Sequence, residues 1–131
     1  MIETGIVLLA LLLMIVGIMD FGQFLFFHQA LVDRARAGAR YAIANTYSAT
    51  AIKNVVMFDS PTNPGGATKG LFGLTAAYIN VIPTPNAAAP TWIEVNITGF
   101  PIVLLSPYLT KSYTHRPIRA VRQVEALGAT N

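Results

Sequence analysis

Residues that could carry out catalysis are few in this chain and lie far apart. The 131 residues include only two histidines, His28 and His115, and no cysteine, which excludes a thiolate nucleophile, a disulfide and a thiolate-bound metal. His28 lies in an apolar stretch with no serine or aspartate in a triad arrangement around it, and His115 lies in a polar segment. No histidine and carboxylate have metal-ligand spacing, and Gly65-Gly66 is too short for a phosphate-binding loop. We therefore expect no enzyme activity, metal or cofactor.

Two carboxylates stand out because they flank a long apolar run. Glu3 and Asp20 lie at its two ends, and a charged side chain in hydrocarbon costs roughly 3 kcal/mol unless it is paired. Each acid is expected either at a membrane interface or in an ion pair that sets register between subunits. In the second case, Glu3 pairs with an α-amino group. Asp20 then pairs with a basic residue of an axially shifted neighbour, taken from Arg34, Arg36 and Arg40.

The element that must position these acids is a long N-terminal helix. The chain is 53% apolar and only 11% charged, and it has no lysine or arginine before Arg34. The apolar stretch to Phe27 would measure about 40 Å as a helix, against about 30 Å for the core of a bilayer. A signal peptide would need a basic start and a small-residue cleavage site, and neither is present. We predict that residues 1–27 span a membrane or line the core of a filament.

The helix is predicted to continue past the membrane edge. Residues 29–57 contain no proline, and apolar or small residues recur there at helical spacing. We predict an amphipathic half at 28–58, within a single helix that runs from about Ile2 to Met57 and is about 84 Å long. Asp59-Ser60-Pro61 would end it, because proline cannot continue a helix.

Small residues mark places where this helix can bend or approach a neighbour closely. Gly17 and Gly22 flank Asp20, and each costs about 1 kcal/mol relative to alanine in a helix interior. We expect them to provide either local flexibility or close helix packing. A second group, which favours close approach of helices, consists of Ala35, Gly38, Ala39 and Ala42.

The remaining residues, 59–131, are predicted to form a small β-rich head. Candidate strands lie at 74–82 and 91–98, and the second places Ile93, Val95 and Ile97 on one face. Residues 118–127 could form a third strand or a short helix, and their β-branched residues favour the strand. Three antiparallel strands packed on the amphipathic helix half give an α+β fold.

The charge pattern does not indicate a nucleic-acid partner. The net charge of +3 is mild, and the arginines fall in two short groups with no recognition motif beside them. Solvated faces or pairing between subunits explain these groups better.

Several of these features together resemble a known family. The motifs are Glu3 with the aliphatic run after it, the acid-aromatic-glycine step Asp20-Phe21-Gly22, and the segments Gln29-Ala30-Leu31 and 36–42. They resemble the N-terminal signature of TadE-like pseudopilins, in the tight-adherence (Tad) branch of type IV pili. The resemblance extends over residues 3–42 and, less closely, over 92–125. Because Glu3 lies nearer the start than the acid of type IV pilins generally, we expect the mature chain to begin slightly upstream or the register to differ.

The resemblance implies a structural subunit of a Tad-type filament that polymerises through its N-terminal helix. The implied partners are copies of the chain or related pilins, inner-membrane lipid before assembly, a prepilin peptidase and the pilus assembly machinery. The implied location is the bacterial inner membrane and then an extracellular filament. Two alternatives stay open: a single-span assembly or adaptor protein that never polymerises, and a membrane-tethered enzyme.

Overall fold

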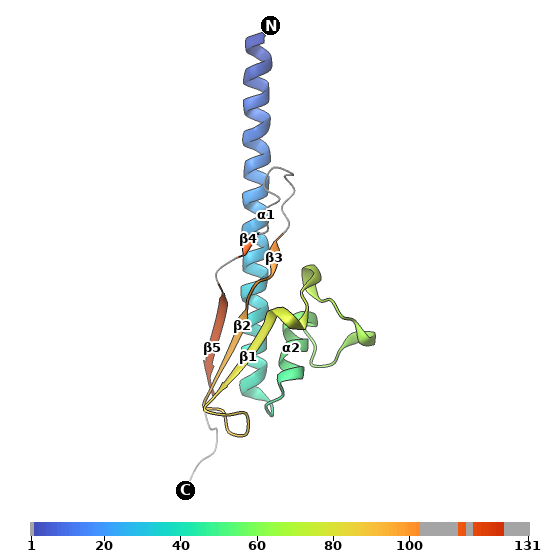
Figure 1. Ribbon diagram of the computed structural model, residues 1–131, viewed down its shortest axis with the longest axis vertical. Helices are drawn as coiled ribbons and strands as arrows, with labels where there is room; N and C mark the ends of the chain where they lie inside the picture. Colours follow the sequence, from blue (N-terminus) through green and yellow to red (C-terminus); the bar gives the residue numbers. More distant parts are fainter. Residues whose placement is uncertain (1, 103–112, 115–116, 125–131) are drawn as a thin grey trace.

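A single long helix dominates the molecule. The computed structural model describes residues 2–102, 113–114 and 117–124, and its first element is α1, Ile2–Ala44. The N-terminal half of α1 projects far beyond the rest of the chain, while its C-terminal half is packed against the other elements (Figure 1). The predicted α+β fold, with a long apolar helix and a small antiparallel sheet on its C-terminal half, is confirmed.

The prediction of one helix from Ile2 to Met57 is wrong, because α1 ends at Ala44 and a second helix, α2, Ala49–Phe58, packs back against it. The side chain of Asn45 donates a hydrogen bond to the carbonyl oxygen of Tyr41 at 3.1 Å. Ser48 is extended and its hydroxyl accepts a bond from the amide of Ala51 at 3.4 Å, so it is the N-cap of α2. Such polar side chains compete for backbone groups and favour helix ends over helix interiors.

The head contains a three-stranded antiparallel sheet in the order β1-β2-β5. Strand β1 is Ile79–Thr84, β2 is Trp92–Ile97 and β5 is Ile118–Gln123. The strands predicted at 91–98 and 118–127 are therefore present over most of their described length, and the strand predicted at 74–82 begins later. Short 3-10 turns at Pro64–Gly66, Leu71–Gly73 and Ala76–Tyr78 precede β1. A separate pair is formed by β3, Pro101–Ile102, and β4, Tyr113–Thr114.

The core lies between α1, α2 and one face of the sheet. As predicted, Ile93, Val95 and Ile97 share the buried face of β2. Past Asp20, the buried positions on α1 follow helical spacing and are mostly small: Leu31, Ala35, Gly38, Ala39 and Ala42. We call this set the seam.

Gly38 is the point of closest approach within the seam. A Cβ atom placed there would lie 2.5 Å from Cγ2 of Val56, on α2. This distance is well below a normal carbon–carbon contact, so the absence of a side chain at Gly38 lets α2 lie close against α1. Hence the small-residue group predicted to support close helix contact does so within the chain.

Candidate functional site

The most unusual surface of the chain is the N-terminal half of α1. No residue in its most apolar 18-residue window is buried, and the helix is long and apolar enough to cross a membrane. Its large aliphatic side chains are exposed on every side, from Ile2 through Met19. Soluble monomers rarely expose continuous apolar area of this extent, and such a surface is compatible with anchoring in a membrane.

Glu3 and Asp20, the two predicted register acids, lie in different surroundings. Glu3 is exposed near the free end of α1, whereas Asp20 is only 3% exposed. The carboxylate of Asp20 is therefore already enclosed within one copy of the chain. Its pairing with a neighbour stays a prediction, and that pairing would require Asp20 to be uncovered first.

The three arginines predicted to pair with Asp20 also differ from one another. Arg34 forms an ion pair of 3.0 Å with Asp59, just after α2, and Arg36 lies 3.7 Å from Asp33 one helical turn earlier. Arg40 is exposed and forms no ion pair with any residue that the structure describes. The partnership of Arg34 with Asp59 was not predicted, because it depends on α2 folding back along α1.

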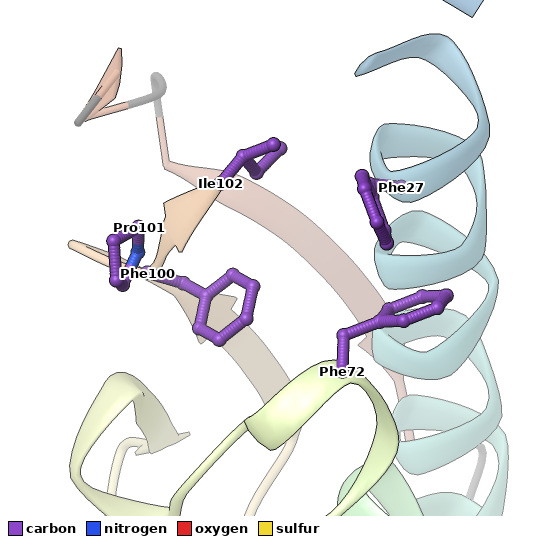
Figure 2. A pocket seen from close by; sticks show the side chains of 5 residues that line it. All are labelled: Phe27, Phe72, Phe100, Pro101 and Ile102. Carbon is purple, nitrogen blue, oxygen red and sulfur yellow. The ribbon is translucent and has the colours of Figure 1, made fainter. Parts of the chain in front are cut away.

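An aromatic cluster fixes the point where α1 emerges from the head. Phe72, in a turn with a positive φ of 57°, packs edge-on against Phe27 of α1 at a centroid distance of 4.5 Å. Figure 2 shows Phe27 and Phe72 facing Phe100, Pro101 and Ile102 across a small hollow of about 100 Å³. Binding pockets for small molecules usually measure roughly 300–1,000 Å³, so we assign this hollow to packing.

Phe72 is a residue whose role sequence reasoning missed. Its signal is an apolar pair, Leu71-Phe72, placed between Gly70 and Gly73 in an otherwise polar loop. Apolar residues inside a glycine-flanked turn indicate that the turn packs on something. The contact also gives a role to Phe27, the last residue of the apolar stretch.

The other predicted residues are two glycines and two histidines. α1 passes through Gly17 and Gly22 without interruption, and a Cβ atom at either would meet nothing within 4 Å. Their effect on flexibility stays a prediction. The ring of His28 lies 6.3 Å from that of Phe24 between centroids, tilted by 32°, while His115 lies outside the described residues.

Comparison with known proteins gives one match. Residues 1–40 match the family model described as TadE-like protein. No curated protein and no solved structure matches the chain. The matched residues contain the exposed apolar half of α1, both acids and all three arginines discussed above. The predicted resemblance is thus confirmed over residues 1–40, where the chain matches the pilus-related TadE-like family.

Proposed function

We propose that this chain is a structural subunit of a Tad-type extracellular filament and polymerises through the N-terminal half of α1. Before assembly, the same half holds the chain in the inner membrane. Glu3 sets the register between subunits, while the head faces outward from the filament. Its partners are further copies or related pilins, and a prepilin peptidase and the pilus assembly machinery act on it.

The observation that carries this proposal is a long apolar helix segment, with no buried residue in its most apolar 18-residue window, that leads into a folded head (Figure 1). Residues 2–19 would measure about 27 Å, close to the thickness of a bilayer core of about 30 Å. Burying one Leu, Ile or Met side chain contributes roughly 1.5–3 kcal/mol. Exposure of this surface to water is therefore strongly unfavourable, and lipid can cover it before assembly and neighbouring helices afterwards. Because lipid tails are as apolar as these side chains, close packing and pairing between helices must favour the exchange.

The experiment separates surface filaments from the membrane pool. Cells that produce the full chain are sheared, the released fraction is examined by negative-stain microscopy, and the chain is quantified there and in the membrane pellet. We expect the chain in filaments. Recovery of the chain solely in the membrane pellet would contradict polymerisation.

Glu3→Ala tests the proposed role of the acid. We expect less chain in filaments and an unchanged amount in membranes, because this acid is exposed and makes no contact that supports the head. Glu3→Gln keeps the size of the side chain and removes only its charge, so it is the matched control for Glu3→Ala. Normal filaments with either variant would show that Glu3 does not set register.

The second candidate function is a single-span assembly or adaptor protein of a pilus or secretion system. It is favoured by the fit between the exposed apolar half and one bilayer, since a monomeric anchor needs no further partner for α1. In that case the sheared fraction lacks the chain, and co-purification from solubilised membranes recovers other assembly components instead.

A further inference from the structure

The head leaves one stripe of α1 open to solvent. Past Phe26, the exposed positions on this stripe follow helical spacing and are Gln29, Asp33, Arg36, Arg40 and Ile43. They cover roughly 100° of the helix circumference at 100° per residue. The stripe is continuous with the exposed N-terminal half, so another chain can reach α1 along its whole length.

Arg40 is the cation of this stripe whose charge is not matched. The Arg34 guanidinium pairs with Asp59 and that of Arg36 with Asp33. Among the described residues, the other cations without an ion pair lie off α1, namely Lys53 on α2, Lys69 in a loop and Arg122 on β5. Arg40 is therefore the cation that a carboxylate approaching the stripe would meet.

The surface beside Arg40 has room for such a carboxylate. Arg40 lines an open hollow of about 340 Å³, together with Arg34, Asp33, Asp59 and apolar residues of α1 and the loop. Both aspartates already have arginine partners. An exposed arginine without an ion pair can bind a carboxylate through two parallel hydrogen bonds.

Glu3 is the acid that fits this position. It is exposed, it is the only acid before Asp20, and no lysine or arginine precedes Arg34 in the sequence. Once its helix is packed among others, its charge needs a cation, and apart from an α-amino group the nearest side chains that can supply one are the arginines from Arg34 onward in another copy. Asp20 is a poorer choice because it is enclosed within its own copy.

The spacing of exposed apolar residues supports the same contact. Glu3 and Arg40 are 37 residues apart, which is about 55 Å along a helix. At the same offset Ile6 of one helix lies level with Ile43 of the next, and both are exposed, at 63% and 37%. A contact that joins the charged pair thus also covers an exposed isoleucine on each side.

We infer that the Glu3 carboxylate of one copy binds the Arg40 guanidinium of a second copy shifted by about 55 Å along the helix axis. This inference rests on the proposed function, since it names the contact that would set the register of the polymer. It places the tip of one α1 against the C-terminal end of another.

Charge exchange tests the pair directly. We expect Glu3→Arg and Arg40→Glu each to lower the amount of the chain in the sheared fraction by about tenfold or more. A tenfold change corresponds to only a modest loss of pairing free energy. The double exchange should recover most of the wild-type amount. Glu3→Arg combined with Arg36→Glu is the matched control on the same stripe and should not recover it. Failure of the first double variant, or equal recovery by the control, overturns the pair.

Cysteine cross-linking gives a second readout that does not depend on charge. The chain has no cysteine, so Ile6→Cys with Ile43→Cys introduces the only two thiols. They are too far apart on one helix to join within a copy, and oxidised filaments should therefore give a ladder of disulfide-linked oligomers. Ile6→Cys with Val121→Cys, an exposed position on β5, is the control and should give none. Filaments of the first variant that give no ladder overturn the inference while the proposed function stands. Absence of wild-type filaments defeats the proposed function and the inference with it.

Discussion

The two halves of α1 differ in the size of their apolar side chains and in whether these are buried. The N-terminal half carries large aliphatic side chains all round, and they are exposed on every side. The head half buries one narrow seam, made mostly of alanine and glycine, against α2 and the sheet. One continuous helix therefore has a half that packs within the chain and a half whose large aliphatic side chains do not.

The difference in residue size reflects the kind of partner. Small residues in the seam allow α2 to approach α1 at a fixed distance, which Gly38 and Val56 define. Bulky residues in the N-terminal half suit surroundings that adapt to them, such as lipid, or neighbours that bring equally bulky side chains. The same substitution should consequently change the stability of the head by different amounts in the two halves.

The largest difference is expected between Leu31→Ala and Leu12→Ala. Leu31 is fully buried in the seam, so its truncation should lower the free energy of unfolding by about 2–5 kcal/mol. Leu12 is exposed, and its truncation should leave head unfolding within about 0.5 kcal/mol of wild type. Urea unfolding of the full chain in detergent, followed by fluorescence of the single tryptophan, Trp92, measures both. Equal losses would show that the N-terminal half also packs within the chain.

A smaller difference is expected between two glycines. Gly38→Ala introduces a methyl group at 2.5 Å from Val56 Cγ2, and such overpacking typically costs about 1–3 kcal/mol. Gly17→Ala adds its methyl group in open space, so it should leave the head unchanged and favour the helix by about 1 kcal/mol. The same unfolding experiment and far-UV circular dichroism give the two values.

The double variant Gly38→Ala with Val56→Ala checks the cause of the loss at Gly38. Truncating Val56 removes the methyl group that the new side chain meets. The double variant should therefore lose less free energy of unfolding than the two single variants lose together. Strict additivity would mean that Gly38 is needed for a reason other than its distance from Val56.

Most of the fold follows from patterns that the sequence displays locally. The apolar run predicts the exposed helix half, and the alternation of Ile93, Val95 and Ile97 with polar residues predicts β2 and its buried face. The same logic predicts a register role for Glu3 and Asp20, because carboxylates are costly in apolar sequence, and that role stays a prediction. What could not be predicted depends on residues distant in the chain, such as the pairing of Arg34 with Asp59 and the packing of Phe72 on Phe27.

The break between α1 and α2 has a local signal in the sequence, but a weak one. Residues 45–48, Asn-Thr-Tyr-Ser, contain no glycine or proline, and helical periodicity of apolar residues continues across them. The available signal was the pairing of an asparagine that can end one helix with a serine that can begin the next. The helical periodicity of apolar residues across 45–48 is the stronger pattern, and it predicts a single helix.

Ser48→Ala measures how much of this break is local, and its effect should be the smallest of the series. Loss of the hydrogen bond from the Ala51 amide should lower the free energy of unfolding by about 1 kcal/mol. This lies in the lower part of the range of about 0.5–2 kcal/mol for N-caps, because the bond is long, at 3.4 Å. Thr50→Ala, at an exposed position in the first turn of α2, controls for a change of propensity alone and should be nearly neutral. Ser48→Asp should keep the stability, since aspartate is also a good N-cap. If Ser48→Ala and Thr50→Ala are equivalent in Trp92-detected unfolding, the cap does not hold the break. The close approach of Val56 to Gly38 would then be what turns α2 back along the head half of α1.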